Sequence, residues 1–94
     1  MLYLNVTYTM PKEHRESFLA DIVAQDIPAR TRKERGNHAY DFSVPLERDN
    51  QVYLREIWDD DALEEHKKSA NIKLLGAMKE KYGIETVLTI SHFD

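Results

Sequence analysis

The stretch REIWDDDALEEH, residues 55–66, contains the change from a strand to a helix on which the interpretation of the fold depends. It begins inside the run QVYLREIW, residues 51–58, whose β-branched and aromatic side chains are typical of a strand. Asp59 to Asp61 follow, and we expect an aspartate among them to be the N-cap of a helix, with acidic groups in its first turn. The stretch therefore predicts a strand and a helix in close succession.

The helix predicted after the aspartates extends to Gly83. Its apolar positions, such as Leu63, Ala70 and Leu74, recur at helical spacing, with a break expected near Ser69–Asn71. His66 belongs to the same stripe of the helix. We therefore expect its imidazole to point towards the sheet.

The first half of the chain predicts a strand and an interrupted helix. Residues 2–9, LYLNVTYT, read as a strand, in which alternation separates Leu4 from Asn5 on opposite faces. A helix is expected from Pro11, and Pro28 should kink or end it near Ile27, because proline removes a backbone donor. A further turn then leads to Gly36, which fits a helix C-terminal cap.

Cations gather in that last turn, at Arg30, Arg32, Lys33 and Arg35. They can be interpreted as a phosphate-binding cluster. They also fit a solvated helix end, whose positive groups complement the negative end of the helix dipole.

The remaining segments complete an α+β pattern. Residues 38–45 form a strand joined to 51–58 by the polar turn LERDN, and residues 84–93 form a last strand. The order β-α-β-β-α-β predicts the ferredoxin-like arrangement, a four-stranded antiparallel sheet with helices on one face. Right-handed connections then place strands 2–9 and 51–58 in the middle of the sheet.

Length and composition limit the classes of function. The chain has 94 residues, so we expect one domain over residues 1–94. It has no cysteine, which excludes disulfides and thiolate chemistry, and a formal charge of −4, which argues against general nucleic-acid binding. No apolar run reaches the roughly 20 residues of a membrane helix, and the N-terminus lacks a signal-peptide pattern, so we expect a cytoplasmic protein without membrane association.

One layer of helices leaves the other face of the sheet uncovered. Apolar side chains nevertheless occur on both faces, including Tyr3, Tyr53, Ile57, Val87 and Phe93. A contiguous apolar surface of this kind marks an interface. We therefore expect a homodimer in which two sheets pack face to face.

The segments ERGNHAYDF (34–42) and VYLREIWDDDALEEHKKSANIK (52–73) resemble the antibiotic biosynthesis monooxygenase (ABM) domain family. The pattern is a glycine after the first helix, an aromatic-rich strand, and Glu–x–Trp followed by Ala–Leu–x–x–His; the resemblance spans nearly the whole chain. The chain departs from the family in a loop from Trp58 to Ala62 that is one residue shorter. It also has Ala70-Asn71 where the family often has Pro-His.

The resemblance implies dimeric α/β-barrel proteins of the ferredoxin-like type. Members include oxygenases that oxidise phenols, quinols or anthrones without metal or flavin, and others degrade haem or isomerise a phosphorylated sugar. This chain is similar to the haem-degrading branch at Asn5, but has Lys67 and Ala77 where that branch uses a tryptophan and a histidine, so the iron ligand is lost. Haem chemistry is therefore not expected, and the resemblance implies no cofactor and no metal.

The candidate site is a pocket between the sheet and the helices. Asn5 and Glu56 lie on neighbouring strands and come close if they face the same side, and His66 points towards them from the helix. His66 is the candidate base, Glu56 a second acid or base, and Asn5 a donor to a developing oxyanion. Trp58 and Tyr40 are the candidate walls for an aromatic small-molecule substrate.

Structural roles remain open for the same residues. Glu56 can be half of an ion pair with Arg55, Trp58 can be a core residue, and His66 can bond a carboxylate that fixes the helix to the sheet. The protein would then be a non-catalytic small-molecule-binding or stress-response protein. A third alternative, a sugar-phosphate isomerase, requires cations inside the pocket.

Overall fold

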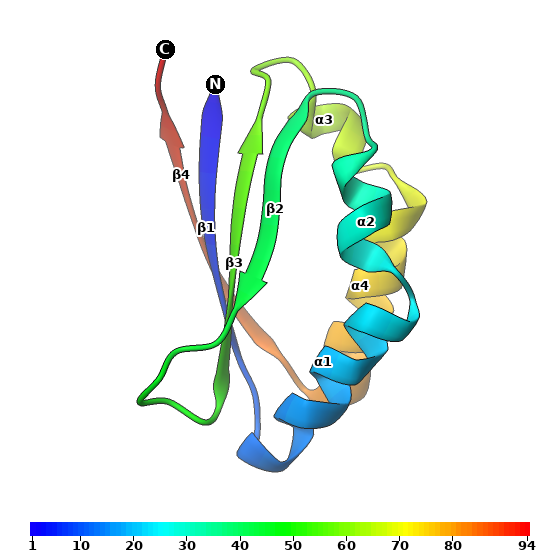
Figure 1. The fold of residues 1–94 in the computed structure, drawn as a ribbon, viewed down its shortest axis with the longest axis vertical. Coiled ribbons are helices and arrows are strands. Elements are labelled where there is room, and N and C mark those ends of the chain that lie inside the picture. The colour runs from blue at the N-terminus through cyan, green and yellow to red at the C-terminus, as the bar shows by residue number, and fades with distance from the viewer.

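A four-stranded antiparallel sheet forms one layer of the structure, and the helices lie against one of its faces (Figure 1). The computed structural model describes residues 1–94. In chain order the elements are β1 (Leu2–Thr9), the 3-10 turn η1 (Lys12–His14), α1 (Arg15–Ala24), α2 (Ile27–Arg32), β2 (Asn37–Ser43), β3 (Gln51–Trp58), α3 (Leu63–His66), α4 (Ala70–Tyr82) and β4 (Glu85–His92). The predicted ferredoxin-like α+β class is confirmed, with each predicted helix divided into two.

The strand order is β2-β3-β1-β4, which confirms that residues 2–9 and 51–58 occupy the middle of the sheet. Leu4 of β1 lies opposite Glu56 of β3 and opposite Ile90 of β4. Cross-strand partners share a face of the sheet, while successive residues of a strand alternate between faces. The register therefore directs Leu4 and Glu56 to the same face, which is the one beneath the helices.

The core fills the space between this face and the helices. Alternate residues of β1 and β3 are buried there, and so is one stripe of each longer helix. The 16 buried apolar residues include Val6, Tyr8, Phe18, Ile22, Val52, Leu54, Trp58, Leu75 and Met78. No helix is both long enough and apolar enough to cross a bilayer.

The first helix is interrupted at Asp26, directly before Ile27. Asp26 adopts the left-handed conformation, with φ of 56°, and separates α1 from α2. Pro28 lies in the first turn of α2. The expected interruption near Ile27 and the further helical turn after it are therefore present, but the expectation that Pro28 causes the kink or end is wrong. A proline is tolerated in a first turn because the backbone N–H groups there have no acceptor within the helix.

The aspartates after β3 do not cap α3. Ala62 precedes this helix and no side chain caps it. Asp59 instead contacts His38 at 2.7 Å, Asp60 the N-terminal ammonium at 2.8 Å, and Asp61 the Arg35 guanidinium at 3.3 Å. The expectation of an aspartate cap is wrong, because each carboxylate contacts a basic group from another segment.

The expected break is present before α4, whose N-cap Ser69 accepts the Ile72 N–H at 3.3 Å.

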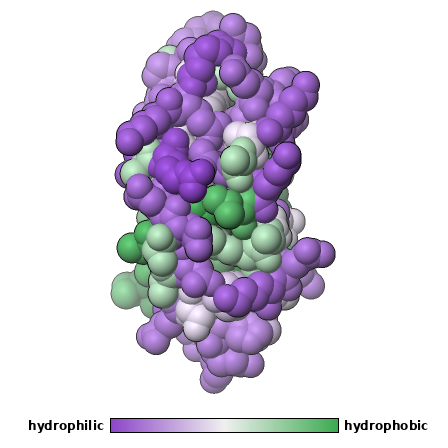
Figure 2. All heavy atoms as spheres, turned by 90° about the vertical axis from the view of Figure 1, so that its right-hand side faces the viewer, coloured by the Kyte–Doolittle hydropathy of each residue, from purple (hydrophilic) through white to green (hydrophobic).

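The sheet face opposite the helices is open, and apolar side chains lie on it. Tyr53 is 36% exposed, Val87 64% and Phe93 40%. No residue of the edge strand β4 is buried, so Leu88 and Ile90 on its other face are also exposed. The helical layer, in contrast, is mostly hydrophilic around a small apolar area (Figure 2).

Gly36 is required where the chain passes from α2 to β2. Its φ is +80°, and a Cβ built there would collide with the Cβ of Ala62 and lie 3.2 Å from the Cβ of Asp59. Gly36 does not cap α2, whose C-cap is Lys33, so the expectation of a glycine cap is wrong. The close approach of the chain to the loop after β3 excludes a side chain here.

We expect Gly36→Ala to lower the free energy of unfolding by about 2–4 kcal/mol, because left-handed strain and overpacking add. Chemical denaturation checks this value. Gly76→Ala is the matched control: Gly76 is inside α4 and has nothing within 4 Å of an added Cβ. It should stabilise the protein by roughly 0.5–1 kcal/mol. Equal effects of the two substitutions would contradict the close contact.

Candidate active site

Four polar residues are buried in the protein, namely Thr31, Glu56, His66 and Asn71. Three of them, Glu56, His66 and Asn71, are linked to one another through Glu34 and through a short separation between His66 and Glu56. Buried charged or titratable side chains are uncommon unless they are paired. This group between the sheet and the helices is therefore the candidate active site.

Glu56 enters the site because alternation along β3 turns it beneath the helices, and it is 6% exposed. The indole Nε1–H of Trp58 donates to its Oε1 at 3.0 Å. Burial raises the pKa of Glu56, and the negative charge of Glu34 raises it further. The hydrogen bond from Trp58 and the nearby His66 oppose this rise. Glu56 is not paired with Arg55, which points to the open face and contacts Asp41 at 2.9 Å.

His66 ends α3 and is 4% exposed, which confirms that its imidazole points inward. The ring lies against the Trp58 indole, with centroids 4.2 Å apart and planes inclined by 30°. Nδ1 lies 2.8 Å from Glu34 Oε1, and Nε2 lies 3.7 Å from Glu56 Oε1. A single imidazole thus stands between two carboxylates and against an aromatic plane.

Glu34 reaches the site from the segment after α2. Its second oxygen, Oε2, accepts from Asn71 Nδ2 at 2.7 Å, while the Oδ1 of Asn71 has no partner. Sequence reasoning missed both residues. Glu34 lies within a run of cations and Asn71 on an expected helix break, so neither position carried a signal that it contributes to a site.

Tyr40 and Trp58 belong to the site but are closed off from solvent. They are 1% and 0% exposed. The Tyr40 ring meets His66 edge to face, with centroids 6.3 Å apart. Burial raises the pKa of Tyr40 and of its neighbour Tyr8, so both phenols stay neutral. Neither aromatic side chain lines an open wall in this conformation.

Asn5 does not join the site. It is exposed and lies opposite Arg55 of β3, whereas Glu56 lies opposite Leu4. Asn5 and Glu56 therefore project to opposite faces of the sheet. The condition for Asn5 to contact the same pocket is not met, and Asn5 instead lines a shallow depression on the open face with Tyr53 and Arg55.

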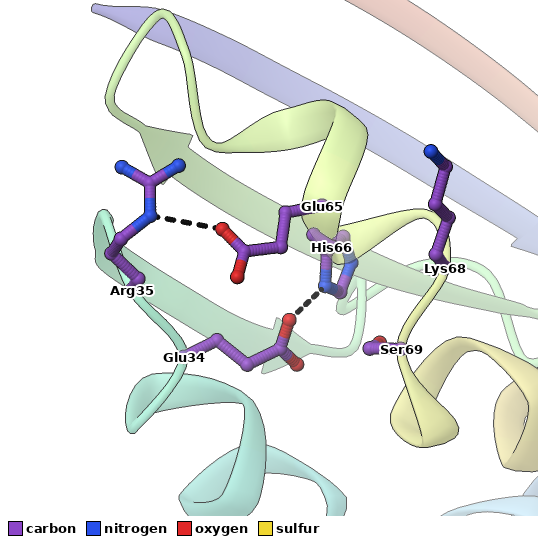
Figure 3. A pocket seen from close by; sticks show the side chains of 6 residues that line it. All are labelled: Glu34, Arg35, Glu65, His66, Lys68 and Ser69. Atoms are coloured by element: carbon purple, nitrogen blue, oxygen red, sulfur yellow. Dashed lines mark hydrogen bonds and ion pairs between the residues drawn. The ribbon is translucent and has the colours of Figure 1, made fainter.

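The open pocket lies at the edge of the buried group (Figure 3). It has a volume of about 400 Å³ and is lined by Glu34, Arg35, Glu65, His66, Lys68 and Ser69. Of the residues expected to line the pocket, only His66 lines this one. The expectation of an open pocket between sheet and helices is wrong in this conformation, because Trp58 and Tyr40 fill that space.

The arrangement is suited to moving protons. His66 is a titratable group with one nitrogen on a carboxylate, and Glu56 is a carboxyl whose burial favours its protonated form. No set of three or more His, Cys, Asp or Glu side chains is grouped as metal ligands.

Several solved structures share this fold. A candidate antibiotic biosynthesis monooxygenase from Deinococcus radiodurans superposes with a TM-score of 0.85 at 19% identity, covering 100% of this chain and 93% of that one. A Bacteroides thetaiotaomicron protein of unknown function, described as a possible oxidoreductase, has a TM-score of 0.84 at 25% identity, covering 98% and 96%. A Pseudomonas aeruginosa protein has a TM-score of 0.84 at 24% identity, covering 98% and 92%.

No curated protein matches the chain in sequence. The family comparison is decisive, because residues 1–75 match the antibiotic biosynthesis monooxygenase model. This region contains β1 to α3 and the first part of α4, and with them every residue of the buried group. The chain therefore belongs to the antibiotic biosynthesis monooxygenase (ABM) family.

Proposed function

We propose that the protein is a cofactor-independent monooxygenase acting on a small aromatic or enolisable compound. The observation that carries the proposal is the buried imidazole of His66, which lies between the carboxylates of Glu34 and Glu56, stacks against Trp58 and reaches an open pocket. Family membership supports an oxidoreductase over other chemistries.

In the proposed reaction, His66 takes a proton from an activated CH₂ group of the substrate or from the hydroxyl of a phenol or quinol. In the second case the anion carries negative charge on a ring carbon, which is the CH₂ carbon of the keto tautomer. The carbanion gives one electron to O₂, and the radical pair combines to form a carbon–peroxide bond. Protonation of the distal oxygen, loss of the second C–H proton and cleavage of the O–O bond then leave a ketone and water. The balance is R₂CH₂ + O₂ → R₂C=O + H₂O. The protein supplies a base, an acid and a water-poor environment.

The charge of the pocket favours a neutral substrate. Arg35 lines it, but its guanidinium is held by Glu65 at 2.9 Å and by Asp61 at 3.3 Å. Glu34 adds a further carboxylate beside His66. A sugar-phosphate isomerase would need a cluster of unpaired cations within the pocket, whereas Lys68 is the single cation of the lining that makes no ion pair. This balance of charge argues against that alternative and leaves a phenol or quinol as the better fit.

A non-catalytic small-molecule-binding protein remains the second candidate. The complete burial of Tyr40 and Trp58 favours it, since they act as core residues and leave no open aromatic wall. A small molecule would then bind in the pocket beside His66 without being converted. The two candidates differ in whether oxygen is consumed.

We expect oxygen uptake with at least one compound among hydroquinones, anthrones and catechols, with one O₂ consumed per ketone formed and no release of peroxide. His66→Ala should lower the rate by about 100-fold or more, because a general base typically contributes 10²–10⁴-fold. An oxygen electrode and product analysis check both expectations. His38→Ala is the control, since His38 is an exposed histidine bound to Asp59. No uptake by the wild type, or equal uptake by His66→Ala, would refute catalysis in favour of the binding protein.

The raised pKa of Glu56 predicts a pH dependence of stability. A carboxyl whose pKa is raised by folding binds its proton more tightly in the folded state than in the unfolded state. Its contribution to the free energy of unfolding is therefore lost as pH rises. We expect the unfolding free energy of the wild type to fall relative to that of Glu56→Gln as pH rises above about 4.3, the ordinary pKa of a glutamate. Denaturation over this range checks it, with Glu65→Gln correcting for the loss of one charge. A difference that rises with pH would contradict burial of the carboxylate.

We also propose that the protein acts as a homodimer that packs its open sheet faces together. The exposed side chains of Tyr53, Val87 and Phe93 on that face support this. A second copy of the chain would cover these side chains.

Sedimentation should give twice the chain mass of 11.0 kDa at micromolar concentration. Val87→Lys should shift the protein to the monomer, because it introduces a charge into the apolar face. Val23→Lys is the control, since Val23 is 75% exposed on α1, away from the sheet. A monomeric wild type, or a dimer that withstands Val87→Lys, would contradict the proposed interface.

A further inference from the structure

Glu34 makes both of its side-chain contacts inside the buried group and none with the cations around it. Oε1 lies 2.8 Å from His66 Nδ1 and Oε2 lies 2.7 Å from Asn71 Nδ2. The neighbouring Arg35 is bound elsewhere, to Glu65 and Asp61. Figure 3 shows the Glu34 side chain directed at the imidazole, while the Arg35–Glu65 pair lies to one side.

An ionised carboxylate accepts hydrogen bonds but donates none. The nitrogen that faces Glu34 must therefore be the protonated nitrogen of the ring, and in a neutral imidazole this leaves the lone pair on Nε2. Nε2 lies 3.7 Å from Glu56 Oε1, which is beyond hydrogen-bond distance. The basic nitrogen of His66 is thus left free.

The other groups around His66 do not fix the position of the ring proton. They are the Glu56 and Trp58 side chains of β3, Tyr40 of β2, Asn71 of α4, and Arg35, Glu65 and Lys68 at the pocket. Among the contacts that these groups make, none is a hydrogen bond to an imidazole nitrogen of His66. The Glu34 contact is the single hydrogen bond of the ring.

We propose that Glu34 is the positioning residue of His66, holding the ring proton on Nδ1 so that Nε2 can accept a proton from the substrate. This inference rests on the proposed function of His66 as the base. Glu34 does not touch the reacting atoms. It orients the ring, and its negative charge stabilises the imidazolium that forms when His66 takes a proton.

Asn71 completes the arrangement by fixing Glu34. Its Nδ2–H₂ donates to the oxygen of Glu34 that does not bind His66. This contact holds the carboxylate in the plane that directs Oε1 at the ring. Without it, the side chain of Glu34 would be free to turn towards Lys68, which lines the same pocket.

The test measures the ring nitrogens of His66 by ¹⁵N NMR, at a pH where titration of the ring shows it to be neutral. Protonated and unprotonated imidazole nitrogens have well-separated shifts, and the His66→Ala spectrum identifies the signals. We expect a protonated Nδ1 and an unprotonated Nε2 in the wild type. Glu34→Ala should move the ring towards the Nε2–H form, and Asn71→Ala should do so to a smaller extent.

Glu65→Ala is the matched control, because Glu65 lines the same pocket but binds Arg35 and not His66. It should leave the tautomer unchanged. With a turned-over substrate, Glu34→Ala should lower kcat by about tenfold or more with a smaller effect on KM, since part of the general-base contribution is lost.

The tautomer measurement needs no substrate, so it separates this inference from the proposed function. The predicted tautomers in a protein that consumes no oxygen would support the role of Glu34 and refute the monooxygenase. An Nε2–H ring in the wild type would overturn the inference even if Glu34→Ala does not fold. So would a ring that is unchanged in a folded Glu34→Ala.

Discussion

The hydrogen bond between Glu34 and His66 joins the two halves of the chain. Glu34 belongs to the segment that follows α2, His66 ends α3, and Asn71 brings the start of α4 to the same carboxylate. Buried polar groups of this kind are costly unless each is paired. The close packing of the Gly36 segment against Ala62 keeps these parts near enough to pair. The site and the helical layer therefore depend on one another.

The fold could be predicted from sequence because its signals are local. Alternation in residues 2–9 and 51–58, together with helical spacing from Leu63, gives the order of elements and the direction of Glu56 and His66. The helix ends were predicted wrongly where one residue type fits more than one position. Pro28 fits the start of a helix as well as its end, and Asp59 to Asp61 found basic partners from distant segments instead of capping α3.

The site could be predicted only in part. Glu56, Trp58 and His66 lie within one short stretch, and their meeting follows from a strand and a helix joined by a tight loop. Glu34 could not be found in this way, because its contact with His66 spans 32 positions and has no periodic signal. The prediction for Asn5 was wrong because a residue on the strand next to that of Glu56 does not necessarily lie on the same face of the sheet. Whether Tyr40 and Trp58 leave a cavity depends on packing, which sequence patterns do not specify.

The central claim is that the pocket beside His66 accepts a neutral phenolic compound. Trp58 is the only tryptophan and lies against His66, so its fluorescence reports directly on this place. An anaerobic titration with a hydroquinone, corrected for absorption with a free tryptophan derivative, measures binding without turnover. We predict a saturable change in the wild type that is lost in His66→Ala and kept in His38→Ala. An unsaturable change, or equal saturation in His66→Ala, would contradict the account.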